Sequence, residues 1–191
     1  MTVPELYIIR HGETEWNRAG RWQGDLDSPL TENGQTQAVA MGGLLRSLNI
    51  TPDSHAFWTS PIGRARKTAA LVLDGQGEAL EDARLREISV GDWTGASREE
   101  VRATSTLHKN ANFLDFYAAT PGGESFASMQ ARTEAVIAGL TGPTVLITHG
   151  ITSRFLRLAA LGWGEERLGE LPGGQGVIFR IHEGCHEELV P

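Results

Sequence analysis

The chain has few of the features that would assign it to a class at once. Among its 191 residues there is one cysteine, Cys185, so an internal disulfide and a cysteine-based zinc cluster are excluded. We therefore expect a reducing compartment and predict a cytoplasmic location. The apolar stretch at residues 6–9 is far too short for an export signal or a membrane segment, and no basic residue precedes it. No membrane association is predicted.

Positive charge is also scarce. The chain has 17 Lys and Arg against 24 Asp and Glu, a net charge of −7, which argues against nucleic acid or an anionic membrane as a partner. A small anionic ligand would need a local cluster of cations to overcome this negative field. The composition, 40% hydrophobic and 21% charged, is typical of a globular chain, and the length predicts one domain over residues 1–191.

Strand and helix patterns alternate along most of the chain. Short apolar runs that predict buried strands occupy residues 5–9, 56–59 and 144–148. Apolar residues at helical spacing predict longer helices at 31–49, after 61, at 126–140 and after 150. Ser60 and Pro61 fit a cap followed by proline at the first helical position, so the second of these helices is expected to begin there. Weaker strand signals follow near 79–80, 177–181 and 187–190, and the last two resemble edge strands.

This alternation predicts an α/β protein, a three-layer α/β/α sandwich around a mostly parallel sheet. Residues 97–119 are polar and mostly helical in pattern. In open parallel sheets, ligands bind outside the carboxyl ends of the strands. Residues 10–12, 60–61 and 148–150 all fall at such ends, so three distant segments are expected to share one site.

Two histidines occupy equivalent positions at these strand ends. His11 follows a buried strand and precedes a glycine, and on its own it is more simply a structural histidine held by hydrogen bonds. His149 repeats the arrangement, since it follows a strand and precedes Gly150 and a helix. The first amide of that helix, from Gly150, offers an unpaired N–H and the positive end of the helix dipole. An anion would fit between these segments.

Arginines near the same edge strengthen this interpretation. Arg64 lies in the first turn of its helix, where the macrodipole opposes a cation at a cost of roughly 0.3 to 1 kcal/mol. A nearby dianion would reverse that cost, although an arginine that simply reaches solvent explains the position equally well. Arg10, Arg64, His11 and His149 together form the cationic cluster that a phosphoryl group requires.

A proton donor is also available in sequence. Glu87 lies in a loop beside the apolar residues Leu85, Ile88 and Val90, and an apolar setting would favour the protonated carboxyl that a general acid needs. From the sequence alone, an ordinary solvated glutamate is the simpler interpretation.

Taken together, these residues resemble the histidine phosphatase superfamily, also called the phosphoglycerate mutase-like family. The resemblance covers nearly the whole chain in five ordered motifs. They are Arg10-His11-Gly12-Glu13-Thr14 with Trp16-Asn17, Gln23-Gly24 through Pro29-Leu30-Thr31 to Gly34, Ser60-Pro61 with Arg64-Ala65 and Thr68-Ala69, Glu87 with Gly91 and Trp93, and Pro121-Gly122-Gly123-Glu124-Ser125 with Thr148-His149-Gly150.

The resemblance implies a set of roles. His11 would be the nucleophile and become a phosphohistidine, and Glu87 would act first as acid and then as base. Catalytic residues would be His11, Glu87, His149, Arg10 and Arg64. Residues that bind the phosphoryl group would be Arg10, Asn17, Gln23, Gly24, Arg64, His149 and Gly150. No cofactor and no metal is implied. Because His11 must be neutral to attack, activity is expected to fall on the acid side.

The same resemblance bears on whether the chain is a phosphatase or a mutase. Mutases of the family are generally longer and carry extra basic residues for the substrate carboxylate, and they usually have a small hydroxyl residue where this chain has Gln23. Both departures favour hydrolysis of a small phosphorylated metabolite. Bisphosphoglycerate-dependent mutase activity and a non-catalytic phosphate-binding relative remain alternatives, and a homodimer is an open expectation. Residues 97–120 resemble the family's variable cap, with candidate specificity contacts at Arg18, Arg21, Arg86, His108 and Lys109.

Three further features of the sequence are a glycine-rich run, a group of His and Cys residues in the tail, and five tryptophans. The run Gly173-Gly174-Gln175-Gly176 does not lie between a strand and a helix as a nucleotide-binding loop does, so a nucleotide-cofactor domain is improbable. His182, Cys185 and His186 could suggest a metal site in the tail, but a polar hairpin explains them better. Most of the tryptophans are expected to serve packing, whereas Trp16 and Trp22 flank loop residues near the expected site.

Overall fold

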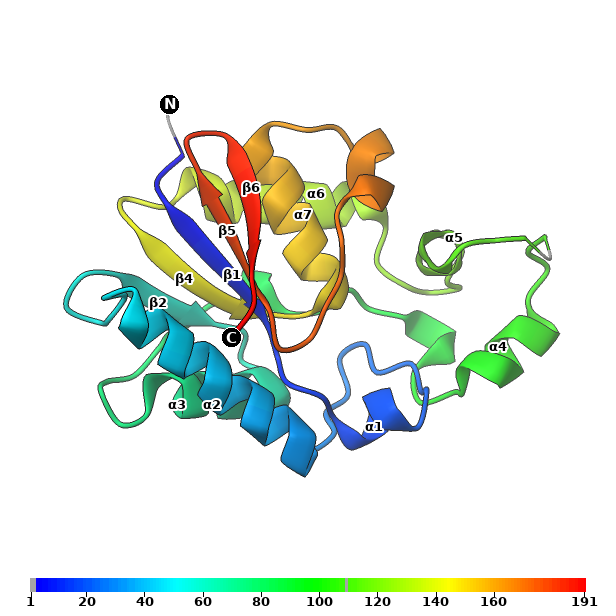
Figure 1. Cartoon of the computed structure of the whole chain (residues 1–191). Helices are drawn as coiled ribbons and strands as arrows, with labels where there is room; N and C mark the ends of the chain where they lie inside the picture. Colours follow the sequence, from blue (N-terminus) through cyan, green and yellow to red (C-terminus); the bar gives the residue numbers. More distant parts are fainter. Residues whose placement is uncertain (1–2, 109) are drawn as a thin grey trace.

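The computed structural model describes residues 3–108 and 110–191, and in these residues a six-stranded sheet lies between two layers of helices (Figure 1). The strand order is β3-β2-β4-β1-β5-β6. The strands are β1 (Leu6–Arg10), β2 (Ala56–Thr59), β3 (Leu80–Glu81), β4 (Thr144–Thr148), β5 (Ile178–His182) and β6 (Cys185–Leu189). Strands β1 to β4 pair in parallel, and β5 runs antiparallel to both of its neighbours, β1 and β6. The predicted α/β sandwich with a mostly parallel sheet is confirmed.

Two pairs of helices cover the two faces of the sheet. Figure 1 shows α2 and α3 on one side and α6 and α7 on the other. The helices are α1 (Glu15–Arg18), α2 (Glu32–Ser47), α3 (Gly63–Leu73), α4 (Arg98–Thr104), α5 (Phe113–Ala118), α6 (Phe126–Ala138) and α7 (Gly150–Leu161). Short 3-10 helices span Ala83–Leu85, Gly91–Trp93 and Glu165–Glu170.

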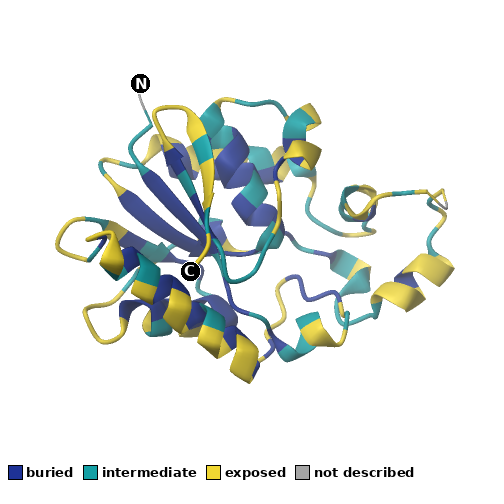
Figure 2. Cartoon of the chain, in the orientation of Figure 1, coloured by how far each residue is buried: buried dark blue, intermediate teal, exposed yellow. Residues whose placement is uncertain are grey.

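The central strands are buried on both faces, as Figure 2 shows in dark blue. Side chains alternate along a strand, so Tyr7 and Ile9 of β1 belong to the core under α2 and α3. Leu6 and Ile8 belong to the core under α6 and α7. Continuous apolar runs are therefore what a strand in this position requires, which is why β1 and β4 were recognisable in the sequence.

The start of α3 differs from the prediction. The helix begins at Gly63 with Ile62 as its N-cap, and no side chain of its own caps it. Asp27 supplies the cap instead, since its Oδ1 accepts the Arg64 backbone N–H at 3.0 Å. A methyl group at Gly63 would lie 2.1 Å from Asp27 Oδ2, so glycine is what allows this carboxylate to approach. A residue far away in sequence thus performs the role that Ser60 was expected to have.

The tail and the insertion also differ in detail. β5 pairs with both β1 and β6, so of these two strands β6 forms the sheet edge, whereas two edge strands were expected. The mostly helical pattern of residues 97–119 gives two short helices, α4 and α5, joined by a loop. Both lie to the side of the sheet, beyond the ends of the strands (Figure 1). Their inner residues, Val101 and Phe116, join a third apolar cluster that also contains Trp22.

Candidate active site

The carboxyl ends of β1, β2 and β4 bring the predicted site segments together. The backbone N–H of His11 donates to the Thr148 carbonyl at 2.9 Å, and that of Ser60 donates to the Ile147 carbonyl at 3.0 Å. His11 and His149 consequently lie side by side, with ring centroids 5.2 Å apart. The strand register therefore brings residues separated by more than a hundred positions into direct contact.

A pocket of about 220 Å³ opens at this edge of the sheet. Drug-sized ligands usually occupy about 300 Å³ or more, so this volume suits a small metabolite. Predicted site residues that line the pocket are Arg10, His11, Asn17, Gln23, Gly24, Arg64 and Glu87. The pocket therefore collects most of the predicted set from four separate segments.

The hydrogen bonds of His11 define which ring nitrogen is free. Nδ1 lies 2.7 Å from the Gly12 carbonyl oxygen, which can only accept, so Nδ1 carries the proton. Nε2 therefore keeps its lone pair and accepts from Arg64 Nε at 3.2 Å. A methyl group at Gly12 would lie 2.1 Å from the Gly34 carbonyl oxygen, so the tight contact of this loop with α2 requires glycine. The ring is held with Nε2 as its unprotonated nitrogen.

Both site histidines are neutral over the physiological range. Burial, together with the charges of Arg10 and Arg64, holds the pKa of His11 well below 6.5. Burial and the charge of Arg64 likewise hold the pKa of His149 well below 6.5. A cation is costly to bury beside other cations, so both rings stay unprotonated.

Arg64 is fixed by the loop that follows α1. Its side chain is 1% exposed, and its Nη1 and Nη2 donate to the carbonyls of Leu26 and Gly24 at 2.6 and 2.9 Å. Asp27 lies 3.5 Å from Nη1 and also caps α3. The carboxylate offsets the unfavourable position of a cation at a helix N-terminus, a role that the sequence analysis assigned to a bound dianion.

Asn17 is oriented by two hydrogen bonds to its carbonyl oxygen. Oδ1 accepts from the Thr14 backbone N–H at 3.2 Å and from Gln175 Nε2 at 2.9 Å. The side-chain NH₂ of Asn17 is thereby left to donate into the pocket. Gln175 was not predicted as a site residue, because its glycine-rich run was considered only as a nucleotide-binding loop.

Gln23 and Gly24 shape the wall beside Arg64. Gln23 Nε2 donates to Thr14 Oγ1 at 2.8 Å, and its Oε1 has no partner among the described residues. Gly24 has a φ of +50°, and a methyl group there would lie 2.8 Å from Val90 Cγ2. Glycine is therefore required by both backbone conformation and space.

His149 lies behind the pocket rather than on its surface. It is fully buried, and its Nε2 lies 2.8 Å from Ser60 Oγ. Its Nδ1 is buried and has no partner within the part of the chain that the structure describes. Ser60 was expected to cap a helix in a segment that shares the site, and in the structure its hydroxyl holds this ring.

Arg10 packs against the start of α7. Its guanidinium carbon would lie 3.4 Å from a methyl group at Gly150, so the glycine lets Arg10 approach the helix terminus closely. Burial lowers the pKa of Arg10, and the charge of Glu87 opposes that effect. Arg10 Nε is buried and has no partner in the described residues, which leaves a donor for a ligand.

Glu87 has polar surroundings, so the expected apolar setting is wrong. Its carboxylate accepts from the backbone N–H groups of Ile151 and Thr152, at 3.2 and 3.1 Å, and lies 3.1 Å from Thr152 Oγ1. These donors belong to the first turn of α7, whose dipole suits a carboxylate. The carboxylate oxygens of Glu87 are thus fixed at the mouth of the pocket.

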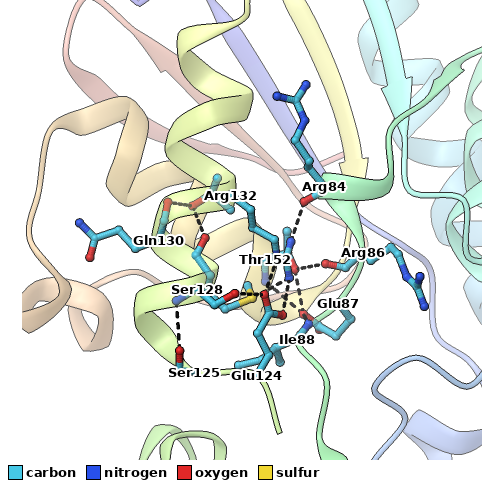
Figure 3. A network of polar contacts seen from close by, with 12 residues as sticks. Arg84, Arg86, Glu87, Ile88, Glu124, Ser125, Ser128, Gln130, Arg132 and Thr152 are labelled. Atoms are coloured by element: carbon cyan, nitrogen blue, oxygen red, sulfur yellow. Dashed lines mark hydrogen bonds and ion pairs between the residues drawn. The ribbon is translucent and has the colours of Figure 1, made fainter.

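A network of polar contacts holds the loop that carries Glu87 (Figure 3). Thr152 Oγ1 donates to the Arg86 carbonyl at 2.6 Å, and Arg132 Nη1 donates to the Arg84 carbonyl at 2.6 Å. Arg132 is itself held by Glu124, with Nε and Nη2 at 2.8 and 3.0 Å from the two carboxylate oxygens. The backbone that precedes the predicted proton donor is therefore anchored to α6 and α7.

The candidate specificity contacts are divided. Arg21 lines the pocket, whereas Arg18 pairs with Glu15 and Arg86 with Asp25 on the surface. His108 lines a separate shallow hollow in the insertion, and Lys109 lies outside the described residues. Of the two flagged tryptophans, Trp22 lines the pocket. Lining residues that the sequence analysis did not assign to the site are Arg98, Arg102, Phe113, Phe116 and Tyr117.

In the described residues, no group of three or more His, Cys, Asp or Glu side chains could hold a metal ion. His186 of the tail stacks on Phe179 and lies 3.2 Å from Arg157 Nη1, so its ring is engaged in packing. Nor, within the described ranges, is any helix long and apolar enough to cross a membrane.

The fold and the pocket define an enzyme class. Neutral imidazoles, clustered arginines and an adjacent carboxylate at the carboxyl edge of a parallel sheet are the parts that phosphoryl transfer needs, because this chemistry depends on positioning and on charge stabilisation.

Comparison with known proteins assigns the chain to a family within that class. The sequence model of the histidine phosphatase superfamily (branch 1) matches residues 6–186, so the chain belongs to this superfamily. It is 33% identical over 185 residues to the probable phosphoglycerate mutase GpmB of Salmonella choleraesuis (strain SC-B67), over 86% of this chain and 79% of that protein.

Solved structures agree with this assignment. The mycobacterial glucosyl-3-phosphoglycerate phosphatase Rv2419c has a TM-score of 0.82 and 28% identity, covering 98% of this chain and 97% of that one. Bacillus stearothermophilus YhfR has a TM-score of 0.76 and 31% identity, covering 98% and 96%. The chain is a histidine phosphatase, and the enzyme class that the sequence predicted, a hydrolase of phosphoric monoesters, is confirmed.

Proposed function

We propose that the chain hydrolyses a small phosphate monoester in two steps, through a phosphohistidine on His11. The observation that carries the proposal is the state of the His11 ring. Its Nδ1–H is committed to the Gly12 carbonyl, so the unprotonated Nε2 is the atom available for attack. The low pKa of His11, caused by burial and by Arg10 and Arg64, keeps it neutral at ordinary pH.

The phosphoryl oxygens would be held by donors from several segments. Among the described residues, Arg10 Nε and the Asn17 NH₂ have no partner, and Arg64 already donates to the nucleophilic nitrogen. As phosphorus approaches His11, the Arg64 Nε–H can stop donating to His11 Nε2 and donate to a phosphoryl oxygen instead. The other proposed contacts are Gln23, Gly24, His149 and the amide of Gly150.

Proton transfer would fall to Glu87. In the first step the bond from phosphorus to the ester oxygen breaks, a bond to His11 Nε2 forms, and protonated Glu87 gives its proton to the leaving oxygen. In the second step the carboxylate takes a proton from water, which attacks phosphorus and breaks the nitrogen–phosphorus bond. Inorganic phosphate leaves, and His11 and Glu87 return to their starting states.

The direct test is to trap the intermediate. Protein incubated with a radiolabelled phosphate monoester and quenched in denaturant should carry acid-labile label, and His11→Ala should carry none. His182→Ala, a half-exposed histidine outside the pocket, is the matched control and should label like the parent. Labelling that persists in His11→Ala would falsify the nucleophile assignment. Absence of label and of turnover in the parent would favour the phosphate-binding alternative.

Mutase activity is the second candidate, and the name of the Salmonella relative favours considering it. Against it, the large side chain of Gln23 is anchored to Thr14 inside the pocket and leaves less room for a second phosphate. Adding 3-phosphoglycerate with a bisphosphate primer should give slow release of phosphate and no efficient isomerisation. Efficient formation of 2-phosphoglycerate would overturn the hydrolase proposal.

Several coarser features belong to the same proposal. The substrate would be a small phosphorylated metabolite, and residues 97–120 would act as a cap over the site within one domain of residues 1–191. A cytoplasmic location is supported by the single exposed thiol of Cys185. The sequence left a homodimer open, and light scattering of the purified chain measures the oligomeric state.

A further inference from the structure

The pocket continues beyond the residues that would bind phosphate. Its outer part is formed by the loop after α1 and by α4 and α5, and four aromatic side chains line it: Trp22, Phe113, Phe116 and Tyr117. A phosphoryl group needs donors and cations rather than aromatic rings, so this part of the pocket would face the alcohol portion of a phosphate ester.

The aromatic rings form a wall with one ring left available. Trp22 and Tyr117 meet edge to face with centroids 4.6 Å apart, and Tyr117 meets Phe113 at 6.4 Å and 90°. The Arg154 guanidinium lies over the Phe113 ring, 4.8 Å from its centroid, and Phe113 is still 46% exposed at the pocket. A large apolar side chain that stays half exposed at a pocket wall is typical of a surface that binds a ligand. Aromatic rings favour a flat partner in stacked or edge contact.

A second observation indicates that this wall is built for a ligand. Trp22 is 8% exposed, and its Nε1 is buried without a hydrogen-bond partner among the described residues. A buried donor of this kind costs free energy unless a ligand or water accepts from it. Trp22 is therefore closely packed at the pocket, while its indole N–H has no hydrogen-bond partner among the described residues.

Arginines stand beside the aromatic wall. Arg21 and Arg102 line the pocket from the loop after α1 and from α4, and the Arg102 guanidinium lies 5.5 Å from the Phe116 ring centroid. Neither forms an ion pair with a carboxylate of the described residues, although Arg18, Arg66 and Arg86 at the surface do. Arg21 Nη1 donates to the Gly95 carbonyl at 2.7 Å, so the remaining donors of Arg21 and those of Arg102 offer a site for an anion on this wall of a chain of net charge −7.

Resting on the proposed phosphatase function, we propose that the substrate alcohol carries a flat apolar ring and, beyond the ring, a second anionic group. The ring lies against Phe113 and Tyr117. The second anion reaches Arg21 and Arg102, whose planar donor forks suit a carboxylate or a phosphate. The preferred substrate is thus an arylalkyl phosphate with an anion at its far end, rather than a short aliphatic phosphate.

Binding of non-hydrolysable phosphonates tests the inference without depending on turnover. Four ligands in a two-by-two design separate ring from anion: butylphosphonate, 4-carboxybutylphosphonate, benzylphosphonate and 4-carboxybenzylphosphonate. Calorimetry with the whole chain should show about tenfold tighter binding for the ring and about tenfold more for the carboxylate. Equal affinities for ring and chain, equal affinities with and without the carboxylate, or no binding at all would each overturn the inference.

Two exposed residues allow variants that keep the fold. Arg102→Gln should remove most of the carboxylate advantage and leave the ring advantage unchanged, and Phe113→Ala should do the reverse. Matched controls outside the pocket are Arg66→Gln, an exposed arginine on α3, and Val39→Ala, 51% exposed on α2. Both controls should match the parent. The assignment would be contradicted if a control variant lost both gains in affinity, or if the two pocket variants lost neither.

The corresponding phosphate monoesters separate this inference from the function on which it rests. Benzyl and butyl phosphate have primary alcohols as leaving groups, so differences in kcat/KM reflect binding more than intrinsic reactivity. Selective phosphonate binding without turnover or labelling would refute the phosphatase proposal alone. Turnover of all four esters at equal kcat/KM, with unselective binding, would refute the ring-and-anion inference alone.

Discussion

The side chain of Asn17 is oriented by a residue from the other end of the chain. Gln175 Nε2 donates to Asn17 Oδ1 at 2.9 Å and to the His11 carbonyl at 3.4 Å. Gln175 does not line the pocket, so it would act through Asn17 as a positioning residue. The C-terminal segment therefore has a place in the site that its sequence did not indicate.

Gln175→Ala should lower kcat/KM about tenfold, because one hydrogen bond that fixes the Asn17 amide is lost. The free energy of unfolding should change little. The decisive measurement is a double-mutant cycle: in an Asn17→Ala background, Gln175→Ala should have almost no further effect. Gln76→Ala, at an exposed glutamine beyond α3, is the control. Additive losses in the double mutant would contradict the positioning role.

Glu87→Gln tests the proposed acid at the same scale. Glutamine keeps much of the shape but cannot give up a proton, so kcat should fall about 100-fold for an alkyl phosphate. For p-nitrophenyl phosphate, whose leaving group needs little protonation, the first step should slow far less. Rates measured across a series of leaving groups check this, and an equal loss for all of them would argue against the acid role.

At the scale of elements, α6 holds the loop of the proposed acid. Arg132 joins the Glu124 carboxylate to the Arg84 carbonyl, and both partners of the ion pair are largely buried, with side-chain exposures of 18% and 19%. The pair is worth more than a surface pair because little solvent screens it. Burial raises the pKa of Glu124, but the contacts with Arg132, Ser128 and the Ser89 backbone together lower it below its usual value.

Arg132→Gln should lower the free energy of unfolding by about 1 to 3 kcal/mol, since it leaves Glu124 without its partner. It should also lower kcat more than it raises KM, because the Glu87 loop loses an anchor while the phosphate ligands stay in place. Urea unfolding and steady-state kinetics measure both effects. Arg167→Gln, which breaks an exposed pair with Glu170, should change neither by a measurable amount. Unchanged kcat in Arg132→Gln would refute the bracing role.

At the scale of the whole molecule, the buried histidines link stability to pH. The pKa of His11 and of His149 lies well below 6.5 in the folded state because both rings are buried near arginines, whereas 6.5 applies to the unfolded chain. Below pH 6.5 the unfolded state takes up protons that the folded state does not, so stability falls as the pH is lowered. The contribution of each ring to the slope is at most about 1.4 kcal/mol per pH unit.

Urea unfolding at pH 7.5, 6.5 and 5.5 should show this loss, and His149→Asn should reduce the slope below pH 6.5. Gln76→Ala, at an exposed position without a titratable group, is the control and should leave the slope unchanged. Protonation of His11 should lower kcat/KM at acid pH. Because the pKa of His11 is lowered, this fall should be centred well below pH 6.5. An acid limb centred at pH 6.5 or above would show that His11 is not the titrating group.

The parallel strands, the long helices and the meeting of two histidines at one edge of the sheet could be predicted from the sequence. β1 and β4 are buried on both faces, so their apolar runs were readable, and His11 and His149 follow them directly in the chain. In a parallel sheet the carboxyl ends of strands share one edge, so covalent order alone predicts that these residues meet.

The contacts that hold those residues exist only in the folded chain. The cap of α3 by Asp27, the contact of Ser60 with His149 and the hydrogen bond from Gln175 to Asn17 each join segments far apart in the chain. The polar partners of Glu87 come from α7, although its sequence neighbours are apolar. Local patterns report whether a segment is buried and in which conformation, whereas hydrogen-bond partners depend on which segments pack together in space.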